Sequence, residues 1–186
     1  ALLMLSGTAE PNADLACLST VSSETLEATR HYFACGGVEN LKECLTFLAD
    51  SLLFTSFGYA APRTLPDHGF YHGSKDCRKL LGDFKTENYH GLVAVLFYRA
   101  HWLSGNLKFV DAIISDLEEH GLCAIGIYTA SLRCLNEEGK ALALAQLDAY
   151  GITLDTIINT TSFSASEYGD ALEAAPQQDS VPILQA

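Results

Sequence analysis

The stretch "LVAVLFYRAHWLSGN", Leu92 to Asn106, decides the fold. Its first seven residues are all apolar, which is typical of a strand covered on both faces in a parallel sheet. Arg99 and His101 follow directly, and Ser-Gly-Asn then precedes a segment with helical periodicity. This order predicts a buried strand, a polar exit from that strand, and a helix that Asn106 caps.

Two further apolar runs continue the pattern. They are "LCAIGIY", Leu122 to Tyr128, and "LDTIINTTSF", Leu154 to Phe163. A helix is expected between each pair of strands, the first after Asn106 and the second opening at Asn136. Strands and helices that alternate in this way predict an α/β fold, a parallel sheet with helices on both faces in a Rossmann-like βαβαβ unit.

The residues before this unit are predicted to be mainly helical. Ser22 is a favourable N-cap for a helix that Gly36 and Gly37 end. Leu41, Cys44, Leu45, Leu48 and Leu52 then form one apolar stripe at helical spacing. The stretch "YAAPRTLPDHGFYHGS" is rich in Pro and Gly and is expected to be irregular, and a short helix should follow Ser74.

Two domains are expected on this basis. Residues 1–90 would be a mainly helical segment with an N-terminal strand remnant, and residues 91–186 a parallel α/β unit truncated at its C-terminus. Apolar runs at Ala1 to Leu5 and Val181 to Ala186 are interpreted as strands cut short. Because the sequence also begins with Ala, we expect the chain to be a piece of a longer protein.

The composition excludes several classes of function. The 186 residues carry a net charge of −12, and 48% of them are hydrophobic. Lys and Arg form no cluster, so nucleic acids and anionic membrane surfaces are not expected as partners. Six cysteines without a Cys-x-x-Cys pair are typical of reduced thiols in a cytoplasmic protein.

Polar side chains follow each of the three strands that form the predicted unit. Ligands of open parallel sheets bind outside the carboxyl ends of the strands, so these side chains predict a rim for a polar, anionic ligand. Arg99 would pair with a carboxylate, and the backbone amides near Gly105 and Asn106 would meet an anion. The substrate-binding candidates are Arg99, His101, Gly105, Asn106, Ser131, Thr161 and Ser162.

Each candidate also has a structural explanation. Arg99 could equally form a structural ion pair with an acidic residue. His101 could form hydrogen bonds that support the loop after the strand. Asn106 is typical of a helix cap, and Ser and Thr of turns. His72 and His101 are weak candidates for metal binding, because His68 and His72 lie four residues apart but Gly69 argues against a helix there.

Motifs of nucleotide-binding and hydrolytic enzymes are absent from the 186 residues. The sequence contains no G-x-x-x-x-G-K-[ST], no G-x-G-x-x-G after a strand and no G-x-S-x-G. The residues alone therefore support an α/β ligand-binding fold without a specific reaction.

Several segments resemble the large-subunit family of aerobic cobaltochelatase. They are, in chain order, "GGVENLKECLTFLAD", "FGYAAPRTLPDHGFYH", "FYRAHWLSGN", "EEHGLCAIGIYTASL" and "DTIINTTSFSAS". The large subunit of magnesium chelatase is a more distant relative, and the tryptophan and "SGN" favour the cobalt enzyme. Within this resemblance, Arg99 and His101 match the family's strand-exit motif and His72 matches its Gly-x-Tyr-His-like segment.

The resemblance implies a metal chelatase. The family inserts cobalt, as a substrate ion, into hydrogenobyrinic acid a,c-diamide during cobalamin synthesis, while AAA+ ATPase and accessory chelatase subunits hydrolyse ATP. A base must take the pyrrole protons, and His101 is a candidate, although no catalytic residue is identified. The alternatives are a magnesium chelatase large subunit acting on protoporphyrin IX, a non-catalytic docking domain for the ATPase subunits, or a free-standing sensor. The isolated chain is expected to be inactive.

Overall fold

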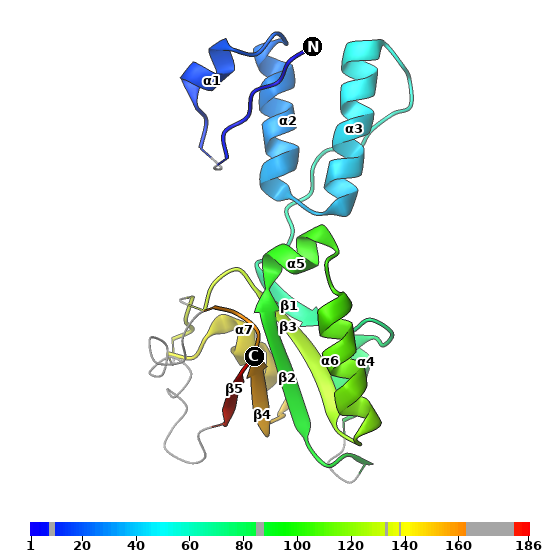
Figure 1. The fold of residues 1–186 in the computed structure, drawn as a ribbon, viewed down its shortest axis with the longest axis vertical. Helices are drawn as coiled ribbons and strands as arrows, with labels where there is room; N and C mark the ends of the chain where they lie inside the picture. The colour runs from blue at the N-terminus through cyan, green and yellow to red at the C-terminus, as the bar shows by residue number, and fades with distance from the viewer. Residues whose placement is uncertain (8–9, 85–87, 133, 138, 163–180) are drawn as a thin grey trace. The chain divides into compact units, whose positions relative to one another are not determined.

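The computed structural model describes residues 1–7, 10–84, 88–132, 134–137, 139–162 and 181–186. The chain forms two compact units (Figure 1). The helical unit consists of Ala1–Leu65 with Leu103–Gly105, and the sheet unit consists of Pro66–Trp102 with Asn106–Ala186. Within the residues that the structure describes, no helix is long and apolar enough to cross a membrane.

The helical unit contains the two predicted helices and a short helix, α1 (Ala13–Cys17), that was not predicted. The predicted helices are α2 (Ser23–Cys35) and α3 (Val38–Leu53). Ser22 caps α2, because its side chain accepts a hydrogen bond from the Thr25 amide. Gly36 and Gly37 have φ angles of 64° and 86°, which glycine adopts readily, and they separate α2 from α3 as predicted.

The buried face of α3 differs from the predicted stripe. Asn40, Cys44 and Phe47 are buried, whereas Leu41 and Leu45 are 37% and 70% exposed. The reason is the Asn40 side chain, whose amide donates to the carbonyls of Gly36 and Arg63 and accepts from the Arg63 amide. These bonds fix the rotation of α3 so that a polar residue points inward, which apolar periodicity does not anticipate.

The predicted N-terminal strand remnant is wrong. The first residues form no regular structure, and hydroxyl groups of Ser19 and Thr20 accept hydrogen bonds from the amides of Met4 and Leu2. Side chains therefore satisfy backbone donors that a neighbouring strand was expected to satisfy.

The sheet unit confirms the predicted α/β class. Its strands are β1 (His68–Tyr71), β2 (Leu92–Tyr98), β3 (Cys123–Thr129), β4 (Thr156–Asn159) and β5 (Ile183–Gln185), in the order β1-β3-β2-β4-β5. β2 pairs in parallel with both β3 and β4, and β4 pairs in parallel with β5. β5 confirms the strand expected at the C-terminal end.

β1 is an edge strand that the sequence did not predict. It lies in the stretch expected to be irregular and pairs antiparallel with β3. An edge position tolerates the nearby Pro66 and the internal Gly69, which argued against regular structure. Because β1 belongs to the sheet, the sheet unit begins at Pro66, whereas the expected boundary lay between residues 90 and 91.

The helices of the sheet unit depart from prediction at two places. They are α4 (Cys77–Gly82), α5 (Arg99–Ser104), α6 (Lys108–Glu119), α7 (Leu142–Ala145) and the 3-10 helix η2 (Gln146–Tyr150). α5 begins immediately after β2, so the expected polar loop is helical. Asn136 opens no helix, because its side chain accepts from the Lys140 amide and its carbonyl accepts from the Gly139 amide, which closes a turn.

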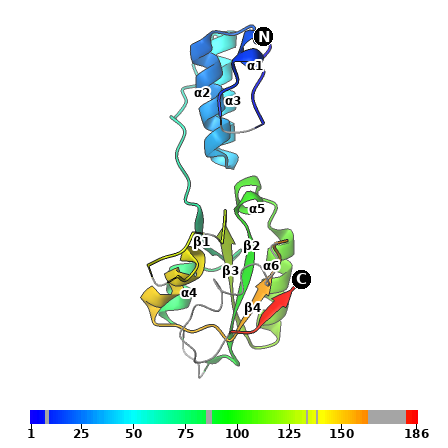
Figure 2. The same ribbon diagram turned by 90° about the vertical axis from the view of Figure 1, so that its left-hand side faces the viewer.

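Helices cover both faces of the sheet, as predicted (Figures 1 and 2). Side chains alternate along each strand, so that Val95 and Phe97 of β2 pack with Val110 and Ile114 of α6. Leu96, on the opposite face, packs in the cluster that contains Leu81 of α4 and Leu144 of α7. β2 and β3 are thereby buried on both sides, which explains their continuous apolar runs.

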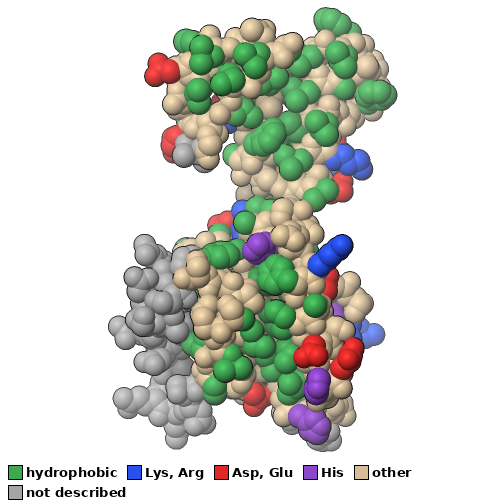
Figure 3. Space-filling model, viewed as in Figure 1, with side chains coloured by type: hydrophobic (Ala, Val, Ile, Leu, Met, Phe, Trp, Pro, Cys, Tyr) green, Lys and Arg blue, Asp and Glu red, His purple; other side chains and the backbone are tan. Residues whose placement is uncertain are grey.

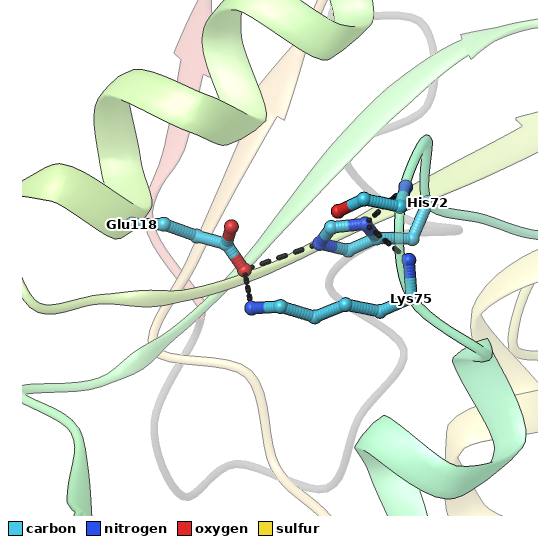
Figure 4. Close-up of polar contacts among 4 residues, drawn as sticks. His72, Lys75 and Glu118 are labelled. Carbon is cyan, nitrogen blue, oxygen red and sulfur yellow. Dashed lines mark hydrogen bonds and ion pairs between the residues drawn. The ribbon is translucent and has the colours of Figure 1, made fainter.

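A polar cluster ties β1 and the following loop to the end of α6. His72 Nε2 lies 3.1 Å from Glu118 Oε1, and the Lys75 ammonium forms an ion pair with the same oxygen (Figure 4). His72 Nδ1 accepts hydrogen bonds from the amides of Ser74 and Lys75, so the ring proton resides on Nε2 and is donated to Glu118. Burial opposes ionisation of Glu118, but these bonds outweigh it and lower its pKa below the ordinary value.

The central position of β2 makes a first prediction. Leu96→Ala should lower the free energy of unfolding of the sheet unit by about 2–5 kcal/mol, because Leu96 is fully buried and the change leaves a cavity. Urea unfolding followed by fluorescence of Trp102, the one tryptophan of the chain, measures this loss. The matched control is Leu184→Ala in β5, where the side chain is 58% exposed, and an equal loss in both variants would contradict the assignment of β2 to the core.

Glu118 makes a prediction about acid stability. Its pKa is lower in the folded chain than the ordinary 4.5, so its stabilising effect is complete above pH 4.5 and is lost as the pH falls through the folded pKa. Glu118→Gln should therefore cost about 1 kcal/mol at neutral pH and should lose less stability on acidification than the unmodified chain. Urea unfolding across the acid range tests this, with Glu119→Gln, the exposed neighbour, as the control. Identical acid sensitivity of Glu118→Gln and the unmodified chain would refute the prediction.

Candidate functional site

The carboxyl ends of three parallel strands lie at one edge of the sheet. The β2–β3 register pairs Tyr98 with Thr129, and the β2–β4 register pairs Leu96 with Asn159. The chain passes from β2 to β3 on one side and then to β4 on the other, so the strand order reverses between β2 and β4. Open α/β sheets bind ligands at such a switch point.

The switch point is closed by a hydroxyl pair. Tyr98 Oη and Ser162 Oγ lie 2.6 Å apart, and the Ser162 amide donates to Tyr98 Oη over 3.0 Å. Thr160, between β4 and Ser162, donates both its amide and its hydroxyl to the Leu96 carbonyl. The predicted candidate Ser162 thus lies at the switch point and is exposed. Its partner Tyr98 is half-buried and was not among the predicted candidates.

Arg99 opens α5 at the end of β2. Its Nε donates to the Pro66 carbonyl over 2.8 Å and lies 3.6 Å from Asp67 Oδ1. The structural ion pair that was one interpretation of this residue therefore exists, in a weak form, because the Asp67 side chain is 77% exposed. Arg99 nonetheless keeps a cation at the predicted edge, with its side chain 17% exposed.

His101 lies on helix α5 and not in a loop. Its ring meets Phe109 of α6 edge to face, with 5.0 Å between ring centroids, and is tilted toward Tyr98 at 6.4 Å. These contacts hold the half-buried imidazole near the rings of Tyr98 and Phe109.

The expected anion site at the start of α6 needs a correction. Leu107, and not Asn106, occupies the N-cap, and no side chain caps the helix. The Asn106 amide already donates to the His101 carbonyl, and Gly105 has a φ of 70°, which lets the chain turn out of α5. The Asn106 amide is therefore not available to an anion.

Two other candidates, Thr161 and Ser131, stabilise the ends of the strands. Thr161 was expected on the rim but is buried, and its amide and hydroxyl both donate to Asn159 Oδ1. Ser131 forms a tight turn with Thr129, whose hydroxyl donates to the Ser131 carbonyl and accepts from the Ser131 amide. Their contribution at the edge is to hold the ends of β3 and β4 in place.

The weak metal candidates lie apart. His101 contacts Phe109 in the first turn of α6, whereas His72 bonds to Glu118 in the last turn, about 13 Å away along the helix. Among the described residues, no three His, Cys, Asp or Glu side chains lie together in a way that could hold a metal ion.

A pocket beside β1 was not anticipated from the sequence. It has a volume of about 520 Å³, and His68, Arg78 and Tyr128 are among the residues that line it. These residues come from β1, α4 and β3, and η2 contributes Tyr150. No spacing in the sequence signals the pocket, since β1 was expected to be a loop and η2 part of a longer helix.

Comparisons with known proteins agree with this architecture. The sequence profile described as CobN/Magnesium Chelatase matches residues 30–186. The aerobic cobaltochelatase subunit CobN of Pseudomonas aeruginosa is 29% identical over the whole chain, and an uncharacterized protein of Methanocaldococcus jannaschii is 27% identical over 95% of it. The solved catalytic subunit of cobaltochelatase from Mycobacterium tuberculosis aligns with 83% of the chain at 30% identity and a TM-score of 0.61.

These relatives are much longer than the present sequence. The chain spans 14% of the Pseudomonas protein, 15% of the Methanocaldococcus protein and 12% of the Mycobacterium chain. The match runs through both units, and the fold agrees with the solved relative. This chain belongs to the CobN/magnesium chelatase family.

Proposed function

We propose that the chain is part of the large, tetrapyrrole-binding subunit of an ATP-dependent cobaltochelatase. The whole subunit would insert cobalt into hydrogenobyrinic acid a,c-diamide in cobalamin biosynthesis. The observation that carries this proposal is the similarity of the complete chain to an aerobic cobaltochelatase subunit, together with the 30% identity to a solved cobaltochelatase. Cobalt is the substrate ion, and the AAA+ partner subunits, which act in the cytoplasm, bind and hydrolyse ATP.

The carboxyl edge of the sheet is the part that we assign to the macrocycle. A corrinoid carries carboxylate and amide arms, which accept hydrogen bonds from guanidinium and hydroxyl groups. Arg99 supplies a cation, and Tyr98 and Ser162 supply hydroxyls at the switch point. His101 would take a proton from the macrocycle when the metal enters, since imidazole exchanges protons near neutral pH.

A corrinoid titration tests this assignment. Trp102 follows His101 directly, so a bound corrinoid, which absorbs the emitted light, should quench its fluorescence. Arg99→Gln and His101→Gln should each weaken corrinoid binding by about tenfold, the usual effect of losing one charge-assisted hydrogen bond. The matched control is His120→Gln at the far end of α6, which should bind as the unmodified chain does.

The result also separates the two metals of the family. A corrinoid should bind more tightly than protoporphyrin IX if the cobalt assignment is right, and the reverse order would favour magnesium chelation. Equal affinity of Arg99→Gln, His101→Gln and the unmodified chain would remove the substrate role from this edge.

A docking role is the second candidate, and the surface of the helical unit favours it. Leu45, Leu53, Phe54 and Phe57 are between 70% and 91% exposed, and apolar side chains gather on this unit (Figure 3). Leu45 and Leu53 lie on α3, and Asp50 fixes the following loop that carries Phe54 and Phe57, because its carboxylate accepts from the Thr55 hydroxyl and from the Phe57 and Gly58 amides. Such exposed apolar groups on a fixed loop are typical of a protein contact.

The docking role predicts a different result. Phe54→Ser with Phe57→Ser should abolish capture of the purified AAA+ partner by the chain and leave corrinoid binding unchanged. Capture by the unmodified chain, with no corrinoid binding at any concentration, would favour docking over substrate binding. Retained capture by the double variant would exclude this surface.

A further inference from the structure

The pocket beside β1 has the size and lining of a small-molecule site. Its volume of about 520 Å³ falls in the usual range of about 300–1,000 Å³ for such sites. Phe70 and Tyr150 provide apolar walls, with their rings edge to face and 6.1 Å between centroids. His68, Arg78, Gln146 and Tyr128 provide the polar groups.

The Tyr128 hydroxyl has no partner within the described chain. The residue is 4% exposed and lines the pocket, yet its hydroxyl makes no hydrogen bond to any residue that the structure describes. Because every buried side-chain oxygen of the described residues has a hydrogen-bond partner, the Tyr128 hydroxyl oxygen itself must be accessible, although the rest of the side chain is buried. This donor points to a molecule that would occupy the pocket.

Two contacts fix the phenol in place. Its ring stacks on Trp102, with centroids 4.3 Å apart and planes 5° from parallel. Gly69, opposite in β1, leaves room for the hydroxyl, because a Cβ there would lie 2.6 Å from the Tyr128 oxygen. The stacking and the lack of a side chain at residue 69 therefore fix the position of the hydroxyl beside β1.

The charges around the pocket favour an anion. Arg78 forms no side-chain hydrogen bond or ion pair with the described residues, and no acidic side chain is among the described residues that line the pocket. Three carboxylates adjoin lining residues in the sequence, and each has a partner elsewhere. Asp67 lies 3.6 Å from Arg99 Nε, Asp76 accepts from the Lys79 amide as the N-cap of α4, and Asp148 forms an ion pair with Lys140. Burial raises the pKa of the Tyr128 phenol, with the Arg99 guanidinium partly opposing the shift, so the phenol stays protonated and can donate at neutral pH.

We propose that this pocket binds an organic carboxylate with a flat apolar body. The carboxylate would accept hydrogen bonds from the Tyr128 hydroxyl and the Arg78 guanidinium, which suits the forked geometry of arginine. The apolar body would lie against Phe70 and Tyr150. This assignment concerns residues outside the switch point and does not depend on the proposed corrinoid site.

A titration of the full 186-residue chain with 3-phenylpropionate tests the pocket. Two-dimensional ¹H–¹⁵N spectra should show saturable shifts of the Gly69, Phe70 and Tyr150 amides. The uncharged 3-phenylpropionamide should bind about tenfold more weakly, because it loses the charge-assisted hydrogen bonds.

Variants identify the donors. Tyr128→Phe keeps the ring and its stacking on Trp102 but removes the hydroxyl, and it should weaken 3-phenylpropionate binding by about fivefold. Arg78→Gln should weaken it by about tenfold, while Lys79→Gln, the same charge change at the next residue of α4, should leave it unchanged. If Tyr128→Phe does not fold, the comparison of Arg78→Gln with Lys79→Gln still tests the proposal, because both side chains are exposed. Equal binding of acid and amide, or equal binding by Arg78→Gln and Lys79→Gln, would overturn the proposal.

The carboxylate has two possible sources, an arm of a tetrapyrrole or a free small acid. A corrinoid with free carboxylate arms should displace 3-phenylpropionate, and its methyl ester should not, if an arm is the natural occupant. Simultaneous binding of the corrinoid and 3-phenylpropionate would identify a free acid. If no corrinoid binds the chain, the proposed corrinoid function fails, and the shifts at Gly69 and Phe70 still decide the pocket.

Discussion

The parallel pairing of β2 with both β3 and β4 is the constraint on which the rest of the sheet unit depends. β2 joins β3 along its full length, from Leu92 opposite Cys123 to Tyr98 opposite Thr129. Strands that are buried on both faces consist mainly of apolar residues, so the polar side chains are found in the residues that follow each strand. Because the strands run in the same direction, those residues meet at one edge.

Much of the polar chemistry at this edge serves the protein itself. Asn159 and Thr161 bond to each other, Thr129 closes a turn with Ser131, and Thr160 returns to β2. These bonds satisfy polar groups that the end of a buried strand would otherwise leave without partners. Tyr98, Arg99, His101 and Ser162 also lie at the end of β2 or β4, where Tyr98 bonds to Ser162 and Arg99 donates to the Pro66 carbonyl. We infer that a large polar ligand would contact a sheet edge that these hydrogen bonds make rigid and that offers few hydrogen-bond donors.

The pocket beside β1 and the switch point use different parts of the same scaffold. Tyr128 lies at the penultimate position of β3, and its ring joins the two regions by stacking on Trp102 of α5. Arg99 bonds to Pro66, which is itself part of the pocket lining. A substitution in α5 that moves Arg99 or Trp102 would therefore alter both the switch point and the pocket, because Arg99 bonds to Pro66 and Trp102 stacks on Tyr128.

The α/β class, the buried strands β2 and β3 and the helices α2 and α3 were predictable, since local periodicity and caps determine them. The edge that gathers Arg99, His101 and Ser162 also followed from strand direction. The family was recognisable from ordered motifs. Tertiary structure alone decided the burial of Thr161, the inward rotation of α3 about Asn40 and the pairing of β1. Asn40 bonds to Arg63, β1 pairs with β3, and the Thr161 carbonyl accepts from the Gln185 side chain, in addition to the bonds of Thr161 to nearby Asn159. Sequence periodicity compares only neighbouring residues, so it carries no information about partners that lie far away along the chain.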